Sequence, residues 1–155
     1  MYFFLTFLPG QAGLILKEHN ANACTDVTGF GLIGHLSEML RGCELAAELW
    51  LEQIPVLPGV HECIAKGIFS SLYPENARLR HAVASVADAQ HHPSFPLLFD
   101  PQTAGGLLAS MPANSSASCV AALLSAGYRV ATIGRVVAQE DSGILVNVLS
   151  EKEVS

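Results

Sequence analysis

Charged residues are scarce in this chain of 155 residues: they make up 14% of it, and only three of them are lysines. Eight Lys and Arg stand against fourteen Asp and Glu, which gives a formal net charge of −6. This balance excludes the basic surface with which a protein binds nucleic acid. It also excludes a lysine-rich phosphate site, so a polyphosphate ligand would need metal cations beside this acidic surface.

Long apolar runs and closely paired cysteines are also missing. The apolar opening, residues 1–8, is far shorter than the ~20 residues of a membrane-spanning helix and lacks the positive start of a signal peptide. We therefore expect no membrane segment here, but either a strand or a segment that normally packs on a part absent from this chain. The four cysteines form no C-x-x-C and no zinc-binding spacing. In a chain with this much apolar material they predict reduced thiols and a cytoplasmic protein.

What the chain does have is apolar material: half of its residues are hydrophobic, which suffices for one buried core. The spacing of these residues predicts helices and strands in alternation. This alternation indicates an α/β (α+β) fold with a single mixed β-sheet covered by helices. We expect helices over residues 11–19, 30–40, 59–66, 76–90 and 114–126, and strands over 1–8, 21–27, 43–52, 95–99, 107–111, 128–137 and 144–149.

The first stretch that could carry chemistry is Cys24–His35, in which three glycines between residues 29 and 34 spell G-x-G-x-x-G. Read alone, this pattern fits a dinucleotide-binding turn. Asp26 argues against that interpretation, because without a cation its carboxylate would repel the pyrophosphate. If Asp26 instead binds a divalent metal, the metal can bind phosphate oxygens, and Mg²⁺ prefers such hard ligands. The third interpretation is that Asp26 caps the turn while the glycines allow tight packing.

The second such stretch, Asp100–Gly106, interrupts two apolar segments. Paired glycines inside a strand pattern predict a bulge or a close approach of two backbones. The side chains of Asp100 and Thr103 can hydrogen-bond nearby backbone groups and hold the turn. The alternative is a loop that faces a ligand.

Three other residues have simpler expected roles. Cys24 has nothing beside it in the sequence that would activate a thiol, so we expect a small buried side chain. His35 follows the glycine turn by one helical turn and is expected to hold the loop through a hydrogen bond. Asn76 is expected to cap a helix.

Three segments carry a family resemblance. Ala23–His35 closely resembles the signature that opens the C-terminal domain of selenophosphate synthetase (selenide, water dikinase). Asp100–Leu108 resembles the second signature of that family, with Ala104 where serine is usual. Ile133–Val137 resembles the closing strand of the domain, and the three segments follow one another in the family's order.

The resemblance implies a C-terminal synthetase-like domain over residues 11–149, after a divergent apolar segment, residues 1–10, and before a tail, residues 150–155. The fold would be that of the C-terminal domain in enzymes related to aminoimidazole ribonucleotide synthetase. The family makes selenophosphate from selenide, ATP and water and releases AMP and phosphate. The resemblance also implies a homodimer, in which the N-terminal domains form the dimer core and hold most of the ATP site.

For individual residues, the resemblance implies that Asp26 is a ligand of Mg²⁺ at the ATP phosphates, with Thr28, Gly29 and Gly31 beside those phosphates. The family's nucleophile, its partner lysine and its other metal-binding aspartates belong to the N-terminal half. We therefore expect no catalytic residue in this chain and no activity of the chain alone. The alternatives are a non-catalytic binding or regulatory domain of the same fold, or the domain of a related ATP-dependent kinase or synthetase.

Overall fold

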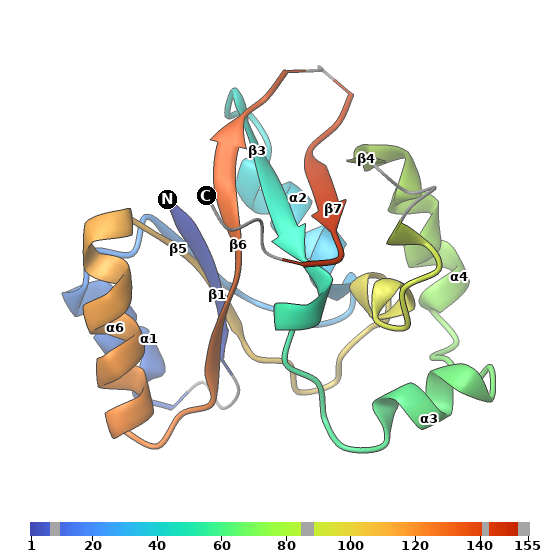
Figure 1. The fold of residues 1–155 in the computed structure, drawn as a ribbon, viewed down its shortest axis with the longest axis horizontal. Helices are drawn as coiled ribbons and strands as arrows, with labels where there is room; N and C mark the ends of the chain where they lie inside the picture. Colours follow the sequence, from blue (N-terminus) through green and yellow to red (C-terminus); the bar gives the residue numbers. More distant parts are fainter. Residues whose placement is uncertain (7–9, 85–88, 141–142, 152–155) are drawn as a thin grey trace.

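The centre of the computed structural model is a β-sheet, whose seven strands in the described residues 1–6, 10–84, 89–140 and 143–151 follow the order β2-β5-β1-β6-β3-β7-β4 (Figure 1). Strand β1 is antiparallel to β5 and β6, whereas β7 is parallel to β3 and β4. The predicted single mixed sheet is thus confirmed. The strands are β1 (Tyr2–Thr6), β2 (Ala23–Asp26), β3 (Leu45–Trp50), β4 (Val83–Ala84), β5 (Leu107–Met111), β6 (Val130–Ala138) and β7 (Val146–Leu149).

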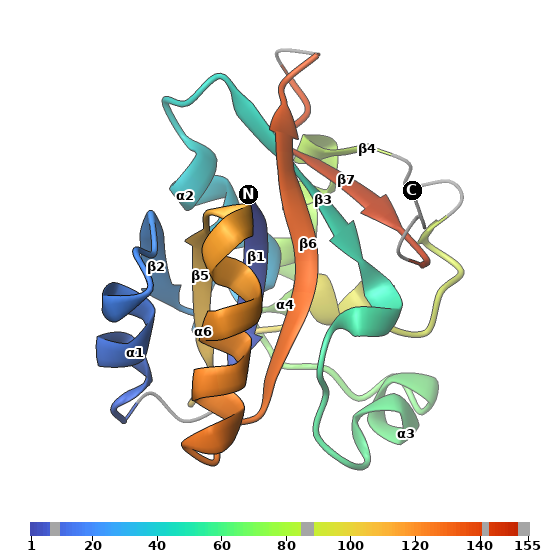
Figure 2. The same cartoon turned by 60° about the vertical axis from the view of Figure 1, so that its left-hand side comes forward.

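Helices cover both faces of this sheet. The helices α1 and α6 lie side by side over the β2–β5–β1 part, and α2 lies on the opposite face (Figures 1 and 2). The α-helices described are α1 (Ala12–Glu18), α2 (Gly31–Leu40), α3 (Val60–Ala65), α4 (Tyr73–Asn76) and α6 (Ala113–Ser125). Short 3₁₀ helices are η1 (Leu51–Gln53), η2 (Ala77–Ala82) and η3 (Phe95–Leu98).

Two apolar cores lie on the two sides of the sheet, because successive side chains of a strand point to opposite faces. Strand β5 shows this alternation. Its Leu108 belongs to the larger core, together with Ile33 and Leu36 of α2. Its Ala109 and Met111 belong to the smaller core, under α1 and α6. Strand β2 pairs with β5, so the first motif starts on a strand held between these two layers.

The helix predicted over residues 76–90 is wrong for residues 77–84. Helix α4 ends at Asn76, a 3₁₀ helix follows, and Val83 pairs with Val146 of β7 in a short strand that the sequence did not indicate. Pairing to the sheet overrides the local helical pattern, since Val83 gains a buried position there. Residues 85–88 lie outside the described residues.

The predicted strand over residues 95–99 is also wrong, because these residues form the 3₁₀ helix η3. A short apolar run fits a buried strand and a buried helical turn equally well. Pro96 decides for the turn, since its ring fixes φ near the helical value and removes a backbone donor. The sequence also predicts a turn at residues 141–143, of which residues 141 and 142 lie outside the described residues.

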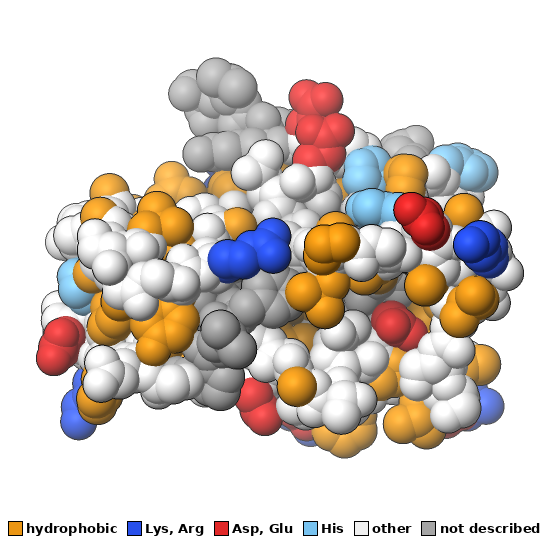
Figure 3. All heavy atoms as spheres, turned by 90° about the horizontal axis from the view of Figure 1, so that it is seen from below, with side chains coloured by type: hydrophobic (Ala, Val, Ile, Leu, Met, Phe, Trp, Pro, Cys, Tyr) orange, Lys and Arg blue, Asp and Glu red, His pale blue; other side chains and the backbone are white. Residues whose placement is uncertain are grey.

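The surface carries single cations and some apolar side chains. On the face shown in Figure 3, Lys and Arg side chains lie apart from one another. Leu57, Ile68 and Leu72 are each more than half exposed around α3 and α4. Within the described ranges, every helix is too short or too polar to cross a membrane.

Candidate functional site

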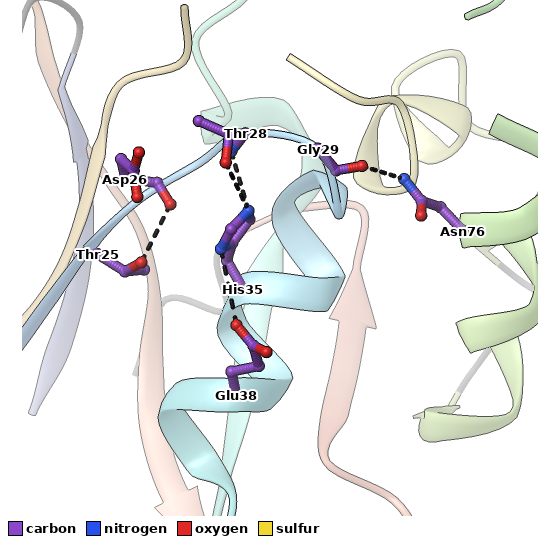
Figure 4. Close-up of polar contacts among 7 residues, drawn as sticks. All are labelled: Thr25, Asp26, Thr28, Gly29, His35, Glu38 and Asn76. Carbon is purple, nitrogen blue, oxygen red and sulfur yellow. Dashed lines mark hydrogen bonds and ion pairs between the residues drawn. The ribbon is translucent and has the colours of Figure 1, made fainter. Parts of the chain in front are cut away.

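Asp26 is the last residue of β2, and its side chain is exposed (Figure 4). Among the described residues its carboxylate has no hydrogen-bond or ion-pair partner, while its backbone oxygen accepts a bond of 3.1 Å from the Thr25 hydroxyl. The carboxylate therefore does not cap the turn that follows it. Two negative oxygens stand at the end of a strand, available to a ligand from outside.

The turn after Asp26 is held from below by His35, which is buried at 6% exposure on α2. The Thr28 backbone N–H donates to Nε2 of His35 over 3.0 Å. Since Nε2 accepts this bond, a neutral ring carries its proton on Nδ1, which lies 3.9 Å from the Glu38 carboxylate. The predicted role of His35, a hydrogen bond that holds the loop, is confirmed.

Two glycines of the first motif, Gly29 and Gly31, have different surroundings, and only Gly31 needs to be a glycine for the turn to form. Gly31 has a φ of +67°, and a Cβ there would lie 2.9 Å from the carbonyl carbon of Phe99. Its own N–H donates to the Thr28 carbonyl. At Gly29, by contrast, a Cβ would meet nothing within 4 Å. Gly31 therefore shapes the turn, whereas the backbone at Gly29 borders open space.

The second motif, residues 100–106, runs directly beside the first. The Val27 N–H donates to the Gly106 carbonyl over 2.9 Å, and the Gln102 N–H donates to the Thr28 carbonyl over 3.0 Å. A Cβ on Gly105 would lie only 1.6 Å from the Val27 oxygen. The predicted close approach of two backbones is confirmed, and it joins two motifs that are far apart in the sequence.

Asp100 departs from its expected local role. Its Oδ1 accepts a bond of 3.3 Å from the backbone N–H of Ser70, thirty residues earlier, and so ties the segment before α4 to the second motif. A cavity of about 150 Å³ lies between the second motif and residues 54–60. Its walls are mostly apolar, and they include Val27, Asp100 and Gly105 but not Asp26.

Asn76 is the residue that reasoning from the sequence missed. Its side chain is buried, and Nδ2 donates to the Gly29 carbonyl over 2.9 Å (Figure 4). The same Nδ2 donates to the Phe99 carbonyl over 3.1 Å. The expected helix cap is therefore wrong. Both partners lie far from Asn76 in the chain, so no local pattern could have indicated them.

Cys24 is exposed, so its expected buried position is wrong. Its pKa is raised above the ordinary value, first because the thiol is partly desolvated and second because the negative Asp26 lies near it. A raised pKa keeps the thiol protonated at neutral pH. Cys24 is thus a poor nucleophile here.

Among these residues, Asp26 can supply one carboxylate ligand to a magnesium site. In the part of the chain that the structure describes, no group of three or more His, Cys, Asp or Glu could hold a metal ion. Mg²⁺ is often bound by one or two carboxylates, with waters and substrate phosphates as its other ligands. Asp26 suits such a role, because it offers hard oxygen atoms that have no competing partner among the described residues.

The fold and site together define an α/β domain with helices on both faces of a mixed sheet and an exposed carboxylate before a glycine turn. The family described as AIR synthase related protein, C-terminal domain, matches residues 10–147, and this chain belongs to it. A crystal structure of thiamine-monophosphate kinase from Stenotrophomonas maltophilia superposes on 97% of this chain and 50% of that one, with a TM-score of 0.58. At 15% identity, this likeness concerns the fold alone.

Relatives with higher identity are named selenide, water dikinase. The one from Cronobacter sakazakii is 44% identical over 128 residues, which are 81% of this chain and 36% of that protein. The one from Geobacter metallireducens is 35% identical over 143 residues, which are 92% of this chain and 41% of that protein. The chain therefore spans about two fifths of the length of these relatives.

Proposed function

We propose that this chain is the C-terminal domain of a selenide, water dikinase, which makes selenophosphate from selenide, ATP and water and releases AMP and phosphate. The names of the relatives support this assignment. The observation that carries it is the exposed Asp26 carboxylate, unpartnered among the described residues, at the start of a turn that other residues hold in place.

In this proposal Asp26 is one ligand of the Mg²⁺ that accompanies ATP. The metal would neutralise polyphosphate charge and stabilise the charge that develops during phosphoryl transfer. Thr28 and Gly29 would lie beside the phosphates, where the open space at Gly29 lets a ligand come close to the backbone. Gly31 would contribute by shaping the turn, since its N–H is already bonded.

The remaining parts of the proposal concern the whole protein. We place the domain at residues 11–149, and the nucleophile, the lysine and the other metal ligands in an N-terminal half that pairs as a homodimer. This chain alone would then be inactive, because a single carboxylate binds Mg²⁺ weakly. A cytosolic location is supported by four cysteines that form no disulfide with one another.

The test joins this chain to the N-terminal half of the Cronobacter sakazakii relative and measures selenide- and Mg²⁺-dependent formation of AMP. We expect Asp26→Asn to lower the rate by on the order of 100-fold, because it removes a charged ligand in the transition state. Glu18→Gln, which neutralises an exposed carboxylate on α1, is the matched control. Thermal unfolding checks that both variants remain folded.

Two outcomes would contradict the proposal. Undiminished activity of Asp26→Asn would remove Asp26 from the metal site. A fusion that folds but forms no AMP would favour the non-catalytic binding or regulatory domain instead.

A further inference from the structure

The amide of Asn76 joins the two motifs from inside the protein. Asn76 is 8% exposed at the end of α4, and its Nδ2 gives one hydrogen to Gly29 and the other to Phe99. Gly29 belongs to the turn of the first motif, and Phe99 directly precedes the second. Both partners are carbonyl oxygens, which only accept, so the orientation of the amide is fixed.

The other links between the motifs lie at different points. The Val27 N–H donates to the Gly106 carbonyl, and the Gln102 N–H donates to the Thr28 carbonyl. Asn76 reaches the turn beyond Thr28, from a different side than His35 (Figure 4). Among the described residues, no backbone hydrogen bond joins the two segments at Gly29 and Phe99.

We propose that Asn76 is a positioning residue, which locks the glycine turn after Asp26 and the 100–106 loop into one rigid unit. Its side chain is suited to this task because a buried primary amide can donate twice from one atom. For catalysis, the consequence would be a fixed direction of the Asp26 carboxylate relative to the second motif. This catalytic part rests on the proposed function, whereas the coupling of the two loops does not.

The first test measures amide hydrogen exchange in this chain. Asn76→Asp keeps the size of the side chain but puts an acceptor where two donors were needed. We expect the exchange protection of Val27 and Gln102 to fall about 30-fold relative to the native chain, the effect of losing two net hydrogen bonds. Strands β3 and β6 should keep their protection. Asn114→Asp is the control, since it adds the same charge at an exposed position of α6.

If Asn76→Asp unfolds the chain, Asn76→Ala repeats the measurement without adding a charge. Unchanged protection of Val27 and Gln102 would overturn the inference. An equal loss of protection in β3 and β6 would also overturn it, since Asn76 would then support the whole fold and not this joint.

The second test uses the fusion protein described above and separates positioning from general stability. In Asn76→Ala we expect the Mg²⁺ concentration for half-maximal rate to rise about tenfold, by analogy with the loss of outer residues that orient metal ligands. An unchanged Mg²⁺ requirement would refute the catalytic part. If Asp26→Asn stays active while Asn76→Asp still frees the loops, the proposed function fails and the coupling stands.

Discussion

A methyl group at Gly105 would collide with the backbone of the first motif. In Gly105→Ala the new Cβ would lie 1.6 Å from the Val27 carbonyl oxygen, whereas ordinary contacts begin at 3.4 Å. The two segments would have to separate by roughly 1.8 Å, the difference between these two distances. The bond from Val27 to Gly106, now 2.9 Å long, would then be broken.

The expected loss of stability follows from the bonds between the segments. Separation breaks the bonds from Val27 to Gly106 and from Gln102 to Thr28. Each broken bond costs about 1 kcal/mol net, and about 1–3 kcal/mol where a buried group stays unpaired. For two bonds, we therefore expect Gly105→Ala to lower the free energy of unfolding by about 2–6 kcal/mol. For a domain of this size, such a loss lowers Tm by roughly 10 °C.

Urea and thermal unfolding measure this loss directly. The matched control is Gly13→Ala on α1, where a Cβ meets nothing within 4 Å. There the same change should stabilise the chain by about 0.5–1 kcal/mol, because alanine favours a helix over glycine. A Tm of Gly105→Ala equal to that of the native chain would refute the close approach of the two motifs.

Two further predictions concern His35 and Cys119. His35→Phe keeps a ring but leaves the Thr28 N–H without its acceptor. Chemical denaturation should therefore show a free energy of unfolding that is lower by about 1–3 kcal/mol. His61→Phe, at an exposed position, is the control, and equal effects of the two substitutions would contradict the role of His35. Burial raises the pKa of Cys119 above its ordinary value of 9.0, so its contribution to stability is complete below that pH and is lost as the pH rises towards the folded-state pKa. Cys119→Ala should remove this part of the alkaline decline above pH 9.0, and parallel declines in both chains would show the prediction to be wrong.

The sequence predicted those parts of the fold that depend on local periodicity. The helix over residues 30–40 and the strand over 107–111 follow from the spacing of their apolar residues, and both lie where expected. The helix over residues 76–90 failed, because pairing of Val83 with β7 is a contact between distant segments. Local patterns contain no information about such a partner.

The same division holds for the candidate site. The hydrogen bond of His35 spans seven residues and could be foreseen from one helical turn. The close approach at Gly105 was indicated by its paired glycines, although its partner Val27 was not. The role of Asn76 could not be predicted, since its partners are 47 and 23 residues away. The exposed position of Cys24 depends on the edge location of β2, which only the strand order reveals.

Strand β1 has a consequence for how the protein is made in the cell. It pairs with β5 and β6, and both neighbours are synthesised long after it. During synthesis, residues 2–6 therefore remain unpaired until β5 and β6, which end at residue 138, have left the exit tunnel of the ribosome. Such distant pairing makes folding slow, so the synthesis of β5 and β6 governs when the sheet can close.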